Sequence, residues 1–335
     1  MFLALTLALL TLAGQVQIWH VFVLAALMGV VNAFDIPARQ AFLVEMVGRG
    51  DLMNAIALNS SMFNGARIIG PAVAGILVAV IGEGWCFLLN GLSYIAVLAG
   101  LLAMRLPPRE ASPREGSALG HILEGIQYVA GTGPIRTLLL LLGLMSLMGT
   151  PFSVLMPIFA DRILHGGPGG MGLLLGASGV GALAGALMLA ARTHVRGLGR
   201  WVAVSAVVFG ASLVLFSISR SFTLSMLLLI PVGFCMMVEM GSTNTLIQAM
   251  VPDHYRGRVM AVYSMMFMGM APFGALLAGA LSRIMGAPAT VAIGGLACLA
   301  GGTLFWIKLP AMRGAGRLLI LAQEEAMEEL SRKDR

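Results

Sequence analysis

The sequence predicts an all-α polytopic membrane protein, and three observations support that fold class. Of the 335 residues, 59% are hydrophobic and only 11% are charged, whereas roughly a quarter of the residues in a globular domain are charged. The mean hydropathy is +0.93. The apolar residues form continuous runs rather than segments with a period of two, which predicts helices. This composition excludes intrinsic disorder and nucleic-acid binding as the main character of the chain.

Ten apolar runs are present, and we expect them to form about ten transmembrane helices packed as a bundle. A helix needs about 20 predominantly apolar residues to cross a bilayer. The runs cover residues 2–14, 18–38, 53–82, 85–104, 136–160, 170–191, 201–218, 222–250, 259–285 and 287–307.

The first run, Phe2 to Gly14, is shorter than a comfortable span and begins directly after Met1. A signal peptide would also be short, but it needs a positively charged segment before its apolar part. No such segment precedes Phe2. A truncated transmembrane helix is therefore favoured over a signal peptide.

The distribution of Lys and Arg predicts the orientation of the chain. When the amino terminus is placed in the cytoplasm, all but four of the 21 basic residues fall on the cytoplasmic face. The exceptions are Arg67, inside a run, and Arg162, Arg220 and Arg283 in loops of the opposite face. Because cytoplasmic loops carry an excess of Lys and Arg, both termini are expected to be cytoplasmic.

Two stretches, one from each half, are similar to each other. The first combines Gln40 with the later Gly70-Pro71 and Gly75, and the second combines Gln248 with Ala271-Pro272 and Gly279. Internal repeats of this kind are typical of transporters. With six runs following a central basic loop, the chain resembles the major facilitator superfamily.

Two motifs place the resemblance among bacterial exporters. The segment Asn32 to Phe42, NAFDIPARQAF, resembles the end of the fourth helix in the enterobactin-exporter and macrolide-efflux-like branch. The segment Gly70 to Gly75, GPAVAG, is similar to the antiporter motif of the fifth helix. The resemblance implies a multi-pass protein of the bacterial cytoplasmic (inner) membrane. In that register the chain begins in the third helix and lacks the first two helices of the family.

The resemblance also implies a domain organisation. The long connection contains Pro107-Pro108, basic residues and an amphipathic stretch from Ala118 to Tyr128. The expected parts are the remainder of the N-terminal bundle with about four helices (1–104), a cytoplasmic central loop with an amphipathic helix (105–135), a C-terminal six-helix bundle (136–309) and a charged cytoplasmic tail (310–335).

One group of residues is assigned to gating or to structural motifs. Asp35 and Arg39 lie four residues apart at a cytoplasmic helix end, where an isolated ion pair contributes only a few tenths of a kcal/mol. In the family the acid at this place joins a charge network with the first loop motif. The second copy of that motif, at 191–200, keeps basic residues but has no Asp. The assigned residues are Asp35, Arg39, Gly70, Pro71, Gly75, Arg256 and Arg258.

Arg67 is the strongest candidate for a substrate or coupling site. It lies midway along the run 53–82, where an arginine costs at least roughly 2.5–3.5 kcal/mol on insertion scales. Ser60, Asn64 and Arg67 share one helical face. A structural arginine satisfied by carbonyl groups is the alternative, and the functional role is favoured because ionisable residues within membranes are usually functional.

Glu239 is the second candidate, in the run 222–250 with Met236, Met237 and Met240 beside it. An apolar setting disfavours the ionised form of a carboxyl group, which is the property a proton-coupling acid needs. An acid paired for structure is an equally weighted alternative.

Tyr263 and the methionines that follow it suggest an adaptable apolar cavity. Met265, Met266, Met268 and Met270 lie within one run, and flexible thioether side chains suit promiscuous binding. Ordinary core filling remains the alternative for most of these methionines.

Several classes of chemistry lack their motifs. There is no G-x-x-x-x-G-K-[ST] phosphate loop, the five histidines are dispersed, and Cys86, Cys235 and Cys298 are isolated in apolar runs. No cofactor, metal site or enzymatic activity is therefore expected.

The expected function is secondary active export of small amphipathic compounds, of the drug or siderophore class, by alternating access and proton-coupled antiport. The expected partners are a small-molecule substrate, protons and the lipid bilayer, with no nucleic acid and a monomeric state. The alternative is a truncated membrane protein fragment that is incompetent for transport.

Overall fold

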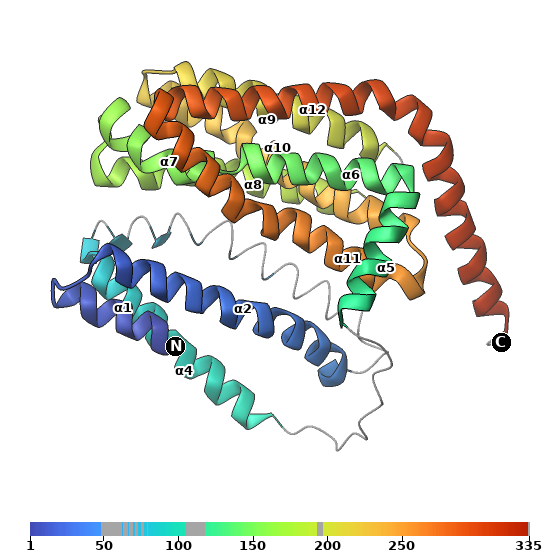
Figure 1. The fold of residues 1–335 in the computed structure, drawn as a ribbon, viewed down its shortest axis with the longest axis horizontal. Helices are drawn as coiled ribbons and strands as arrows, with labels where there is room; N and C mark the ends of the chain where they lie inside the picture. Colours follow the sequence, from blue (N-terminus) through green and yellow to red (C-terminus); the bar gives the residue numbers. More distant parts are fainter. Residues whose placement is uncertain are drawn as a thin grey trace. The chain divides into compact units, whose positions relative to one another are not determined.

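A computed structural model describes residues 1–47, 62, 66, 70, 73–74, 77–78, 80–104, 118–192 and 197–333. Every secondary-structure element among them is helical (Figure 1), which confirms the predicted all-α class. The chain forms two compact units, Met1–Pro113 and Arg114–Arg335. Within the described ranges six helices are long and apolar enough to cross a membrane, and two shorter apolar helices are Phe2–Leu12 and Ile18–Asn32. The count of about ten spans stays a prediction.

The first unit contains α1 (Phe2–Leu12), α2 (Ile18–Val47) and α4 (Glu83–Ala103). Helix α1 packs along α4, with Leu12 seated against Gly84 and Leu5 against Gly91. Those two glycines are seven residues apart and so lie on the same face of α4. The short first run is thus a helix that is packed against the fourth run.

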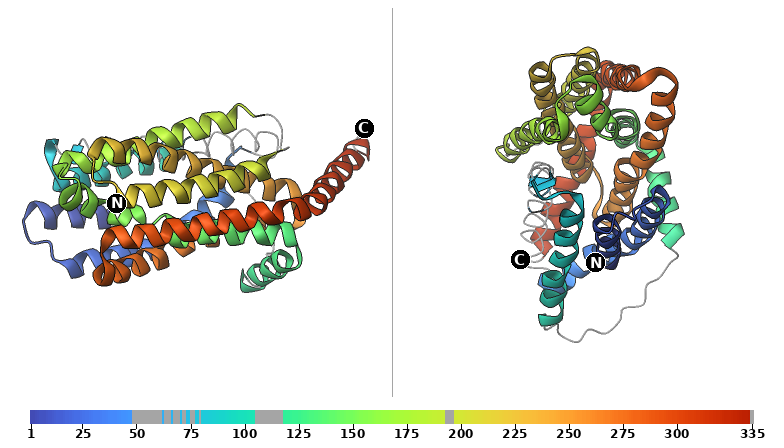
Figure 2. Two further views of the ribbon diagram at one scale, coloured as in Figure 1. Left: turned by 90° about the horizontal axis from the view of Figure 1, so that it is seen from above. Right: turned by 90° about the vertical axis from the view of Figure 1, so that its left-hand side faces the viewer.

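The second unit is a bundle in which the long helices run side by side (Figure 2). Its elements are α5 (Ala118–Gly131), α6 (Gly133–Leu144), η1 (Met145–Gly149), α7 (Phe152–Ile158), η2 (Phe159–Ile163), α8 (Gly167–Ala190), α9 (Leu198–Ile218), α10 (Phe222–Met250), α11 (Asp253–Ser264), η3 (Met265–Gly269) and α12 (Met270–Lys333).

Two of the predicted runs of this unit are interrupted where the sequence suggests continuous helices. The run 136–160 is divided into α6, η1, α7 and η2, and Met265–Gly269 interrupts the run 259–285. The elements η1, η2 and η3 are π-helical turns, which occur as short bulges in helices and often mark functional sites. Helix α12 breaks at Gly286, which has a φ of 84°, so the runs on either side form two separate helical segments.

The predicted tail is continuous with the last pass of the bundle. Helix α12 extends through residues 310–333 without a further break in its helical backbone. One face of its first part lies on the bundle, because Met312, Leu319 and Ile320 pack against the core, whereas Leu318 is 70% exposed. The tail therefore begins as part of the bundle.

Glycines allow the helices of this unit to approach one another closely. Gly181 of α8 lies against the carbonyl of Ile230, and Gly233 of α10 lies against the carbonyl of Ser178. A glycine also allows α9 and α12 to pack closely, where Gly210 contacts the backbone of Leu299. Small residues in membrane helices allow close helix packing, and this explains the close approach of α8 to α10 at Gly181.

We expect Gly233→Ala to destabilise the second unit because the added methyl group would collide with the Ser178 backbone. Overpacking costs typically about 1–3 kcal/mol, so the unfolding midpoint should fall by several degrees. Heating in detergent with a thiol-reactive dye measures this, since Cys235 and Cys298 are buried until the unit unfolds. Gly279→Ala is the matched control, because open space surrounds that position. Equal midpoints for the two variants would contradict the prediction.

Candidate functional site

Glu239 lies at the centre of α10 and is buried, with 2% of its surface exposed. Helix α10 begins at Phe222 after an N-cap in which the Ser221 hydroxyl accepts a hydrogen bond from the Leu224 N–H. One turn after the acid, the Thr243 hydroxyl donates to Glu239 Oε1 at 3.1 Å. The carboxyl group is thus held within the bundle by a partner on its own helix.

Further polar groups share this environment. Cys235, Ser242 and Thr243 stand at i−4, i+3 and i+4 from Glu239, so they share its face of the helix. The Cys235 thiol is hydrogen-bonded to Ser205 of α9, and Cys298 of α12 interacts electrostatically with the Glu239 carboxyl. The Ser242 hydroxyl is buried and has no hydrogen-bond partner among the described residues. We call these six residues the Glu239 cluster.

The cluster lies between α9, α10 and α12, and most of its members are not evident from the sequence. The helical spacing of Cys235, Ser242 and Thr243 around Glu239 is a signal that could have found them. Ser205 and Cys298 come from other helices, and only the packing brings them to the acid. Within the described part of the chain, no group of three or more His, Cys, Asp or Glu side chains could hold a metal ion.

Tyr263 of α11 contacts α10 next to Glu239, at the following residue, Met240. It is 7% exposed, and its hydroxyl donates to the backbone carbonyl of Met240 at 3.1 Å. Its ring lies 6.5 Å from that of Phe267. Tyr263 therefore joins α11 to α10 at the residue that follows Glu239.

The methionines after Tyr263 fall in and beside η3. Met265 and Met268 are 41% and 50% exposed, respectively, whereas Met266 packs against Gly143 of α6. Two of these methionines are thus exposed, and the third fills a gap between helices.

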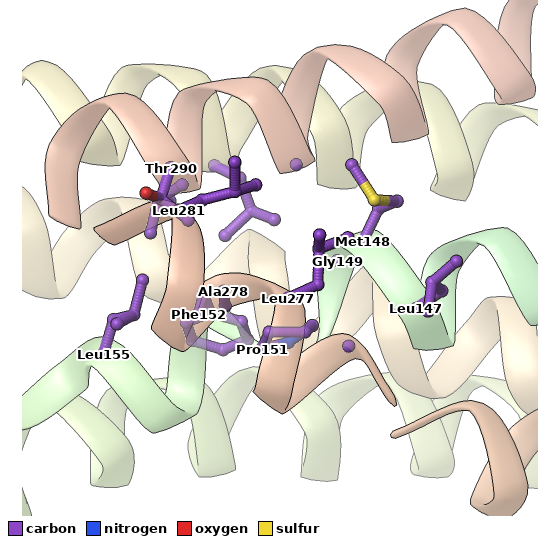
Figure 3. A pocket seen from close by; sticks show the side chains of 14 residues that line it. Leu147, Met148, Gly149, Pro151, Phe152, Leu155, Leu277, Ala278, Leu281 and Thr290 are labelled. Atoms are coloured by element: carbon purple, nitrogen blue, oxygen red, sulfur yellow. The ribbon is translucent and has the colours of Figure 1, made fainter. Parts of the chain in front are cut away.

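A separate apolar hollow lies between η1, α7, α9 and the two parts of α12 (Figure 3). Its interior offers only about 20 Å³ to water-sized molecules, which is room for about one water, and Leu147, Leu155 and Leu281 are among its lining residues. Thr290 brings a hydroxyl to its wall, but that group donates to the Gly286 carbonyl at 2.8 Å. None of the residues predicted for the functional site lines this hollow.

In the first unit, Asp35 and Arg39 form the expected ion pair. Arg39 Nη2 lies 2.9 Å from Asp35 Oδ2, with 66% and 47% of the two side chains exposed. Gly70 is helical and exposed. The other residues predicted here lie outside the described part of the chain: Ser60, Asn64, Arg67, Pro71 and Gly75.

Arg256 and Arg258 both lie in the first half of α11 and are partly buried. Arg258 Nη1 forms an ion pair with Glu124 Oε2 of α5 at 2.7 Å. Tyr128 of α5 stacks on Tyr255 of α11 with ring centroids 4.6 Å apart, and burial raises the pKa of the Tyr128 hydroxyl. The sequence pattern alone pointed to neither Glu124 nor Tyr128.

The chain is similar to known export proteins over most of its length. The major facilitator family described as "transmembrane secretion effector" matches residues 1–328. The multidrug efflux pump Tap of Mycolicibacterium fortuitum is 28% identical over 291 residues, which cover 84% of this chain and 70% of that protein. The staphyloferrin A transporter of Staphylococcus aureus is 24% identical, with coverages of 83% and 70%. The enterobactin exporter EntS of Escherichia coli is 26% identical, with coverages of 85% and 68%.

A solved structure shows the same fold. The chain matches a bacterial homologue of the human lysosomal transporter Spinster, in an inward-facing and unoccupied conformation, with a TM-score of 0.59. The sequence identity is 14%, and the match covers 96% of this chain and 81% of the other. At that identity the likeness concerns the fold alone.

Proposed function

Because the chain belongs to the transmembrane secretion effector family of the major facilitator superfamily, we propose that it exports small amphipathic compounds of the drug or siderophore class. The observation that carries this proposal is the family match along residues 1–328, which includes both compact units. The names of the relatives include a multidrug efflux pump and two siderophore transporters. As a member of this family of transporters, the protein is not an enzyme.

Proton-coupled antiport by alternating access is the mechanism we propose. An acid in a low-dielectric interior is a suitable carrier of a proton, because burial disfavours its charged form. Glu239 meets that description, since it is buried in a long apolar helix with a hydroxyl partner one turn away. The surrounding hydroxyl and thiol groups of the Glu239 cluster offer further polar contacts to either protonation state.

The residues proposed for substrate contact and coupling are Arg67, Asn64, Ser60, Tyr263 and Glu239. The residues proposed for gating or structural motifs are Asp35, Arg39, Gly70, Pro71, Gly75, Arg256 and Arg258. The adaptable side chains of Met265 and Met268, exposed in η3, support a broad preference for apolar compounds. Protons, the bilayer and a small molecule are the proposed partners, and a monomer is the proposed active form.

Reconstituted vesicles test this function. The purified protein is placed in liposomes with an imposed pH gradient, and the movement of ethidium and of enterobactin is followed separately. Uptake of either compound above that of protein-free vesicles, and its loss on collapse of the gradient, would support proton-driven transport. Movement of neither compound, together with no proton flux on adding them, would contradict the proposal.

We also predict the topology, with both termini and the central loop in the cytoplasm of a bacterial cell. Ser112→Cys in the central loop and Ser221→Cys before α10 are compared in a protein lacking Cys86, Cys235 and Cys298. A membrane-impermeant maleimide should label position 221 in spheroplasts and position 112 only after permeabilisation. Labelling of position 112 in intact spheroplasts would overturn the predicted orientation.

A further inference from the structure

Helix α11 is a separate segment of 12 residues with a break at each end. At its start, Val251 is extended and Pro252 precedes the helix, so the backbone of α10 does not continue into it. At its end, the π-helical turn η3 replaces the α-helical hydrogen-bond pattern over five residues. Sharp bends in helices occur at such π turns. The two breaks allow α11 to change its angle without unfolding.

The η3 end of α11 is attached to the bundle by two hydrogen bonds. The Ser146 hydroxyl of η1 donates to the backbone carbonyl of Phe267 in η3. The Tyr263 hydroxyl, one turn earlier, donates to the Met240 carbonyl of α10. Two π-helical turns from different passes are therefore joined at the point where α11 meets the rest of its pass. This end has the properties of a hinge.

The other end of α11 is attached chiefly to α5. The Glu124 carboxylate is paired with Arg258 at 2.7 Å, and the Arg258 guanidinium lies 5.4 Å from the ring of Tyr255. Tyr128 stacks on Tyr255 with an interplanar angle of 20°. Gly125 lies against the Arg258 carbonyl, where a Cβ atom would come within 2.8 Å. We call these α5 to α11 contacts the α5 latch.

The contacts of the α5 latch are suited to repeated breaking and remaking. The side chains of Arg258 and Glu124 are 30% and 50% exposed, so water can solvate both charges when the pair separates. The two stacked tyrosine rings are partly buried and pack against the core. By comparison, α11 has few contacts with α10 along its length. Among the described residues, the Asp253 end of α11 therefore has its main packing partner in α5.

We infer that α11 is a movable arm of the transporter, hinged at η3 and held by the α5 latch, and that Glu124 and Tyr128 are positioning residues for transport. The inference rests on the proposed function and extends it, because it assigns a role in the cycle to the amphipathic helix of the central connection. Release of the α5 latch would let the segment that carries Tyr255, Arg256 and Arg258 swing about η3. Closure would return it to α5.

Hydrogen exchange tests the α5 latch independently of transport. In the full-length protein in lipid nanodiscs, Glu124→Gln with Tyr128→Leu should make the amides of α11 exchange about tenfold faster, given the modest strength of a half-exposed ion pair and an aromatic stack. The amides of α9 should be unchanged. Tyr128→Phe alone keeps the stacked ring and should behave like the parent, and Glu83→Gln in α4 is the matched control for loss of an acid. Unchanged exchange in α11 of the double variant would overturn the inference.

Cross-linking tests the movement of the arm. Glu124→Cys with Arg258→Cys, in a protein lacking the three native cysteines, joins α5 to α11 on oxidation. Transport of ethidium or enterobactin by the cross-linked protein should then be at least tenfold slower than by the same variant kept reduced, which is the reference because it already lacks the ion pair. Gly199→Cys with Leu309→Cys is the control, because these positions are in contact at the ends of α9 and the last pass, outside the arm. Equal transport by the cross-linked and the reduced 124–258 variant would show that the arm does not move.

The two experiments separate this inference from the proposed function. If the reduced parent moves neither compound, the proposed function fails, whereas exchange in α11 still decides whether the α5 latch holds the arm. If the parent transports and the oxidised pair does not, while the control pair does, both proposals are supported.

Discussion

Glu239→Gln is expected to abolish transport driven by a pH gradient while leaving substrate binding intact. The substitution keeps the shape and hydrogen-bonding capacity of the side chain and removes its ability to exchange a proton. The carboxyl is buried, and the other five residues of the Glu239 cluster are not carboxylic acids, so none of them can take over its proton exchange. The measurement is uptake of ethidium or enterobactin into vesicles with an imposed gradient, beside equilibrium binding of the same compounds.

Two comparisons make this result specific. Glu83→Gln replaces an exposed acid in the first turn of α4 and should leave coupled transport unchanged. Thr243→Val removes the hydrogen bond to Glu239 Oε1 but retains the acid, so the pH dependence of transport should shift while transport persists. Unchanged pH-driven uptake in Glu239→Gln would exclude Glu239 as the coupling acid and would leave Asp35 as the next candidate.

Arg67→Ala is the second large effect that we expect, with transport lost and expression largely retained. The sequence places Arg67 midway along an apolar run, where its charge costs at least roughly 2.5–3.5 kcal/mol. A charge kept at such a cost for contact with a cavity is dispensable for folding. The expected outcome is therefore a normal yield of protein in the membrane with export of ethidium reduced to that of cells lacking it.

Arg39→Ala is the matched control for loss of a basic residue. Arg39 is 66% exposed, and its ion-pair partner among the described residues is Asp35, four residues away; partly solvated ion pairs of this kind contribute little to stability. Its yield should also be normal. If cells that carry Arg67→Ala export ethidium normally, Arg67 is structural or extends to the lipid interface, and its assignment to the site is wrong.

The sequence identifies local features of the fold because they depend on residues close together in the chain. Continuous apolar runs predict α8, α9 and α10, because a run of about 20 apolar residues is long enough to form a helix that crosses a bilayer. The Asp35 to Arg39 pair follows in the same way from a spacing of four on one helix. Family membership was also evident, from the motifs around Asp35 and Gly70.

The interruption of the passes was harder to predict. Pro151 and Pro157 lie in the pass that contains η1 and η2, but η3 contains no proline. A π turn leaves backbone carbonyl groups without their usual α-helical partners, and a side chain of a neighbouring helix can donate a hydrogen bond to them. The Ser146 hydroxyl meets the Phe267 carbonyl from 121 residues away, and no local pattern encodes that contact.

The sequence by itself determined the helical class, the family and the presence of an acid at Glu239 within a long apolar run. Only the tertiary structure decided that the acid is enclosed with Ser205 and Cys298, and that Glu124 and Tyr128 contact α11. The physical reason is that hydropathy and helical spacing act within a single helix. The neighbours of a side chain across a helix interface depend on which glycines, such as Gly181, Gly210 and Gly233, permit close approach of the backbones.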